Sequence, residues 1–117
     1  MCIENATIGD LQLALAAGRT TAAALVSAYL ARIEAYDRGR PRLGAVREVN
    51  PDAKAIAAAL DGNKPAERRP LEGIPILVKD NIAAADLQHT TAGSLALADA
   101  RRSGTRRWSS CCGEPVQ

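Results

Sequence analysis

Residues 71–97 read LEGIPILVKDNIAAADLQHTTAGSLAL, and they contain a short apolar run that ends abruptly in polar residues. The run occupies positions 74–78, and Lys79, Asp80 and Asn81 follow it directly. A short apolar run bounded by turn signals is typical of a strand that is buried on both faces of an α/β sheet. We therefore expect Lys79 at the carboxyl end of a buried strand, where open α/β sheets place groups that face a ligand.

Spacing alone leaves several roles open for the polar residues of this stretch. A lysine at a strand end is more often solvated or ion-paired than catalytic, and Asp80 is a candidate ion partner. Asp80 and Asn81 also fit turn and scaffold positions. The loop at 90–94 is expected to enter a further helix with a hydroxyl cap. Ser94 has no base assigned to it, and His89 is interpreted as a bystander in a loop.

Two motifs in this order, GIPILVKDN and TTAGSLAL, resemble the amidase signature family of hydrolases. The likeness continues upstream through ALVSAYLARIEAYDR, AVREVNPDA and PLEGIP, so it covers residues 7 to about 99. Members of that family use a lysine, a serine in a cis peptide and a nucleophilic serine. The resemblance implies that Lys79 is the catalytic lysine. It places both serines in a downstream Gly/Ser-rich segment that residues 1–117 do not contain.

The resemblance implies an amidase that converts a carboxylic amide into an acid and ammonia or an amine through a serine acyl-enzyme. A proton would pass from the nucleophilic serine through the cis-serine to Lys79. A lysine, with a reference pKa of ~10.4, accepts a proton at neutral pH only when its surroundings lower that pKa. The resemblance further implies no metal, no cofactor and a small-molecule amide substrate. It leaves a homodimer open. No membrane partner is expected, because no apolar run approaches the ~20 residues that a membrane helix needs.

Two helices are expected upstream of this stretch. Thr7 can cap the first helix, which carries Asp10 in its first turn and is closed by Gly18. The second is expected to begin at one of the threonines at positions 20 and 21 and to run to about position 37 with an apolar face.

The segment 43–49 alternates loosely between apolar and polar residues, as a strand does. Asn50 and Pro51 suit the cap and first position of a third helix, which should end near Gly62. The order helix, helix, strand, helix, strand predicts an α/β fold. By resemblance, these are the N-terminal helices and first strands of the amidase signature mixed sheet, in an incomplete domain.

Composition excludes several other classes of protein. The chain has 117 residues, of which 47% are hydrophobic and 24% charged, as in one globular domain at most. Its net charge of +2 comes from the segment after position 100, so nucleic acid is not expected as a partner of the folded part. Cys2, Cys111 and Cys112 form no disulfide framework or zinc pattern, and a reducing cytoplasm is the expected location.

Residues 1–100 are expected to form the N-terminal part of an amidase domain, and residues 101–117 an aberrant tail. The tail, RRSGTRRWSSCCGEPVQ, shows no periodic apolar pattern, and it is interpreted as disordered, as a native extension or as frameshifted. With GC-rich codons chosen from Ser103 onward, a shifted frame can encode RDAPVVELLRGAGA, which has the pattern of a capped amphipathic helix. We therefore expect a truncated, inactive amidase fragment. The alternatives are a glutamyl-tRNA(Gln) amidotransferase A-type subunit and a non-catalytic helical interaction module.

Overall fold

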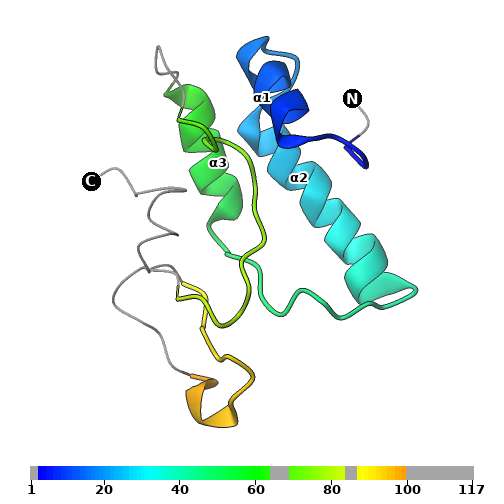
Figure 1. Cartoon of the computed structure of the whole chain (residues 1–117), viewed down its shortest axis with the longest axis vertical. Helices are drawn as coiled ribbons and strands as arrows, with labels where there is room; N and C mark the ends of the chain where they lie inside the picture. The colour runs from blue at the N-terminus through cyan, green and yellow to red at the C-terminus, as the bar shows by residue number, and fades with distance from the viewer. Residues whose placement is uncertain (1–2, 64–68, 84–86, 100–117) are drawn as a thin grey trace.

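The computed structural model describes residues 3–63, 69–83 and 87–99. In these ranges it contains α1 (Ile8–Ala16), α2 (Ala22–Arg32), a π-helical turn η1 (Ile33–Gly39), α3 (Ala53–Gly62) and a 3₁₀ turn η2 (Leu95–Leu97). Figure 1 shows α3 beside α2, and the described residues between α3 and η2 form no helix. The three expected helices are confirmed, whereas the predictions for residues 101–117 lie outside the described ranges.

The first helix begins and ends where its sequence predicts. The amide of Asp10 donates to the Thr7 hydroxyl at 3.2 Å, and the amide of Thr7 donates to the Asp10 carboxylate at 2.9 Å, which completes a capping box. Hydrogen bonds from the Thr7 hydroxyl and amide hold the pKa of Asp10 below its ordinary value. Beyond the last turn, Gly18 adopts a φ of 66°, a left-handed conformation that ends helices.

Two side chains satisfy the free amides at the start of α2. Thr21 accepts from the amide of Ala24 at 3.1 Å, as expected for an N-cap. Asp61, from the end of α3, accepts from the amides of Ala22 and Ala23 at 2.8 and 2.9 Å. The carboxylate also lies at the positive end of the α2 dipole. Asp61 therefore joins the end of one helix to the start of another.

Replacing Asp61 with alanine is expected to lower the free energy of unfolding by about 1–2 kcal/mol, the usual cost of losing an N-terminal cap. Asp52 supplies the matched control, because it caps α3 without a side-chain hydrogen bond. Asp52→Ala should cost less than about 0.5 kcal/mol, as ordinary surface changes do. Urea unfolding followed by helical circular dichroism measures both variants. Equal losses in the two variants would contradict the linking role of Asp61.

The core of the described residues is small and lies between the first two helices. Leu11, Leu15 and Leu25 form its buried cluster. Ile3, Ala6 and Ile74 pack against that cluster and remain partly exposed. Ile74 thus ties the stretch after α3 to the N-terminal helices.

The second helix continues past Arg32 as the turn η1, which reaches Gly39. Asp37 in this turn is 6% exposed, and its carboxylate accepts from the amides of Ala45 and Val46 at 2.6 and 3.3 Å. This carboxylate therefore fixes the start of the segment 43–49 against the end of the helix. The helical part thus extends two residues beyond the expected end at about position 37, because η1 includes Arg38 and Gly39.

The expectation of a buried strand at 74–78 is wrong for the described residues. No β-ladder forms in the described ranges, either there or at 43–49. Ile76, Leu77 and Val78 are 45%, 77% and 39% exposed. An apolar strand is buried only when neighbouring strands and helices cover both its faces, and only Ile74 of this segment packs on the core. The helices of the predicted α/β fold are thus observed, and its sheet remains a prediction.

Two other helix predictions also differ from the structure. The third helix begins at Ala53, because the Asn50 side chain accepts from the amide of Asp52 at 2.9 Å and makes a turn before the helix. After the loop at 90–94, the chain forms only the short turn η2, and Ser94 gives it no side-chain cap. The hydroxyl cap expected there is therefore wrong.

Candidate functional site

Lys79 directly follows the apolar run at positions 74–78, and its side chain is exposed. Its carbonyl accepts from the amide of Ile82 at 2.9 Å, so the chain turns directly after the lysine. In the described ranges, no carboxylate forms an ion pair with the Lys79 amine. Ser94 is exposed as well, and its amide donates to the carbonyl of Thr91 at 2.8 Å.

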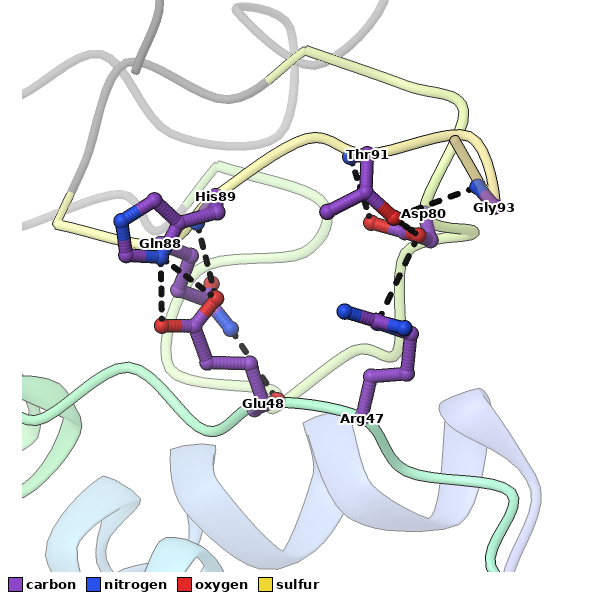
Figure 2. A network of polar contacts seen from close by, with 7 residues as sticks. All are labelled: Arg47, Glu48, Asp80, Gln88, His89, Thr91 and Gly93. Carbon is purple, nitrogen blue, oxygen red and sulfur yellow. Dashed lines mark hydrogen bonds and ion pairs between the residues drawn. The ribbon is translucent and has the colours of Figure 1, made fainter. Parts of the chain in front are cut away.

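Asp80 closes a loop of the chain that returns at Thr91 (Figure 2). One carboxylate oxygen accepts from the amide of Thr91 at 3.1 Å, and the other accepts from the Thr91 hydroxyl. The backbone contributes a further link, because the amide of Ala92 donates to the Asp80 carbonyl at 3.2 Å. Thr91 is only 2% exposed. The residues Asp80 and Thr91, called the clamp below, thus fix the turn that follows Lys79.

The loop needs an unusual backbone conformation where it meets the clamp. Ala92 and Gly93 have φ values of 50° and 79°, in the left-handed region. The amide of Gly93 donates to the Thr91 hydroxyl at 3.2 Å. That hydroxyl therefore accepts one hydrogen bond while it donates another to Asp80. The sequence TTAG supplies a hydroxyl and a glycine at the positions where this turn requires them.

The contacts of Asp80 lower the pKa of its carboxyl group. Hydrogen bonds from the Thr91 hydroxyl and amide hold the pKa of the Asp80 carboxyl below its ordinary value of 3.8, and the charge of Arg47 adds to this effect. The Arg47 Nε atom lies 3.6 Å from the carboxylate. Asp80 is therefore a charged hydrogen-bond acceptor at neutral pH.

This shift predicts an acid-sensitive loop. A carboxyl whose pKa is lowered by folding stabilises the folded form above its unfolded pKa and loses that effect as the pH falls through its folded pKa. We expect the amide resonances of Thr91 and Ala92 to move together on acidification, with a midpoint below 3.8, the ordinary aspartate value. Asp80→Asn should abolish that transition. A transition that persists in the Asn variant would assign it to another group.

A second contact attaches the same loop to the segment 43–49. The Glu48 carboxylate accepts from the amide of His89 at 2.8 Å and lies 3.1 Å from the Nδ1 atom of that histidine. The side-chain amide of Gln88 donates to the Glu48 carbonyl at 3.2 Å. Figure 2 shows this contact and the clamp side by side, with Arg47 and Glu48 adjacent on one segment. His89 therefore has a scaffold role that the sequence did not reveal, since its partner is 41 positions away.

The described residues contain no group of three histidine, cysteine, aspartate or glutamate side chains placed to hold a metal ion. Among the same residues, no helix has the length and apolar character needed to cross a membrane.

Known proteins that resemble this chain share both the helical part and the stretch around Lys79. The family model described as Amidase matches residues 24–104, and the chain therefore belongs to the amidase family. A relative from Schizosaccharomyces pombe that is named as an amidase is 41% identical over 97 residues, which are 81% of this chain and 16% of that protein. The A-type subunit of glutamyl-tRNA(Gln) amidotransferase from Chloroflexus aurantiacus is 41% identical over 102 residues, 85% of this chain and 20% of that protein.

The solved structure of native peptide amidase from Stenotrophomonas maltophilia is 48% identical and has a TM-score of 0.76. The match covers 84% of this chain and 20% of that one. The chain thus spans between 16% and 20% of the length of these relatives.

Proposed function

We propose that this chain forms the N-terminal part of an amidase that hydrolyses carboxylic amides through a serine acyl-enzyme, with Lys79 as the final proton acceptor. The family match over residues 24–104 carries the proposal, because it includes the whole VKDN-to-TTAGS stretch. The position of Lys79, at the end of the apolar run 74–78 and directly before a fixed turn, supports it.

The proposed chemistry needs a lysine that can be neutral at the moment of reaction. A neutral amine within hydrogen-bond reach of a hydroxyl can take its proton and make the oxygen a nucleophile. In this proposal the serines of the Ser-cisSer-Lys triad and the oxyanion donors come from the remaining part of an amidase domain. That part would also cover Ile76, Leu77 and Val78, so that the segments 43–49 and 74–79 become strands of a mixed sheet.

A chimera tests the proposed function. Residues 7–99 of this chain would replace the matching segment of the Stenotrophomonas peptide amidase, to which the chain is 48% identical. The chimera is expected to release ammonia from a C-terminally amidated peptide and to form a serine acyl-enzyme that mass spectrometry detects. A folded chimera that forms no acyl-enzyme would contradict the proposal.

The identity to an amidotransferase chain of the A type supports a second candidate, a component that releases ammonia for the transamidation of misacylated transfer RNA. The two candidates differ in their need for a partner. A stand-alone amidase hydrolyses its substrate by itself, whereas the amidotransferase component would depend on a partner chain for activity. The same ammonia assay, with and without the other chains of that complex, therefore separates them.

A further inference from the structure

We propose that Thr91 and Arg47 hold the Asp80 carboxylate away from the Lys79 amine, so that the amine has no permanent anionic partner, as its proposed role as a proton acceptor requires. Thr91 is then a positioning residue that acts on the lysine through Asp80. This inference rests on the role proposed for Lys79.

The sequence Lys79-Asp80 poses a specific problem for a lysine that serves as a base. A carboxylate within about 4–6 Å of an ammonium group favours the charged form of the amine, which cannot accept a proton. Because the two residues are adjacent, the chain cannot separate them by distance along the backbone. The directions of the two side chains therefore decide how far apart the charges lie, and hydrogen bonds can fix the direction of the aspartate.

The observed contacts of Asp80 supply that direction. Its oxygens accept from the amide of Thr91 at 3.1 Å and from the Thr91 hydroxyl, and one of them lies 3.6 Å from the Arg47 Nε atom. Figure 2 shows the carboxylate between these two residues. Both oxygens are thus engaged by groups of the returning loop and of the segment 43–49. The hydrogen bonds from Thr91 also lower the pKa of Asp80, so the charge to be held is present at neutral pH.

The other acid near this loop is also engaged. The carboxylate of Glu48 accepts from the His89 amide at 2.8 Å and lies 3.1 Å from its Nδ1 atom. Consistent with this arrangement, no ion pair in the described ranges includes Lys79. Within the described part of the chain, the amine is therefore unpaired, and each of the two carboxylates has its own donors.

Competitive acylation of the complete 117-residue chain tests the inference without requiring amide hydrolysis. Limiting acetic anhydride at pH 8 would label the amines, and mass spectrometry would give the rate at Lys79 relative to Lys54, an exposed lysine on α3. Thr91→Val removes the hydroxyl but keeps the shape and the amide. We expect it to free the carboxylate to pair with Lys79 and to slow the relative rate about two- to fivefold, as a surface ion pair would. Thr91→Ser, which keeps the hydroxyl, should retain the wild-type rate.

The double variant Asp80→Asn/Thr91→Val separates this effect from simple loosening of the loop. Without the charge on residue 80, the relative rate at Lys79 should return to the wild-type value. A slow rate that persists in the double variant, or an unchanged rate in Thr91→Val, would overturn the inference whatever the function of Lys79. If the acylation rates change as expected but the chimera forms no acyl-enzyme, the proposed function is wrong, whereas the inference that Thr91 and Arg47 hold the Asp80 carboxylate is supported.

Discussion

Replacing Lys79 with alanine in the peptide amidase chimera is expected to lower kcat for amide hydrolysis by about 10²–10⁴-fold, the usual contribution of a positioned proton acceptor. The loss should appear in kcat, because the amine acts on the reacting hydroxyl and is not proposed to bind the substrate. Lys79→Arg should be equally damaging, since a guanidinium group cannot be deprotonated in proteins. Initial rates of ammonia release at saturating peptide amide measure all three enzymes.

Lys54→Ala supplies the control for this prediction, because Lys54 is an exposed lysine on α3 that the proposal leaves without a role. It should retain nearly the full rate. If Lys79→Ala also retains it, the proposed assignment of the proton acceptor is wrong. If Lys79→Arg remains active while Lys79→Ala does not, the residue supplies positive charge and does not accept a proton.

The sequence predicted the parts of the fold that depend on near neighbours. Thr7 and Asp10 are three positions apart, and their reciprocal capping follows from residue type and spacing alone. Gly18 ends its helix for an equally local reason, since glycine adopts positive φ without strain. The catalytic role that the resemblance implies for Lys79 stays a prediction, and the strand expected directly before it does not form in the described residues.

Contacts between distant positions could not be predicted in the same way. Asp61 accepts from Ala22, 39 positions away, and Glu48 accepts from His89, 41 positions away. The sequence offers many possible hydrogen-bond donors for a carboxylate on a helix or in a loop, and only the packing of the helices and segments decides which donor it meets. The burial of the segment 74–78 failed as a prediction for a related reason, because burial depends on neighbours that the described residues do not supply.

Leu25→Ala is expected to have the largest effect on stability, with a loss of about 2–4 kcal/mol in the free energy of unfolding. Leu25 is 1% exposed and packs with Leu11 and Leu15, so its removal leaves a cavity between the first two helices. In so small a core, few other side chains can move to fill that space. Urea unfolding followed by circular dichroism gives the change in the free energy of unfolding.

Leu95→Ala makes the same chemical change at a residue that is 94% exposed. Its removal opens no cavity, and the loss should stay below about 0.5 kcal/mol. The comparison therefore separates the effect of burial from the general effect of shortening a leucine side chain. Similar small losses in both variants would mean that α1 and α2 do not form a packed core. Ile74 would then have no core to pack against, and the segment that leads to Lys79 would not be held in place by it.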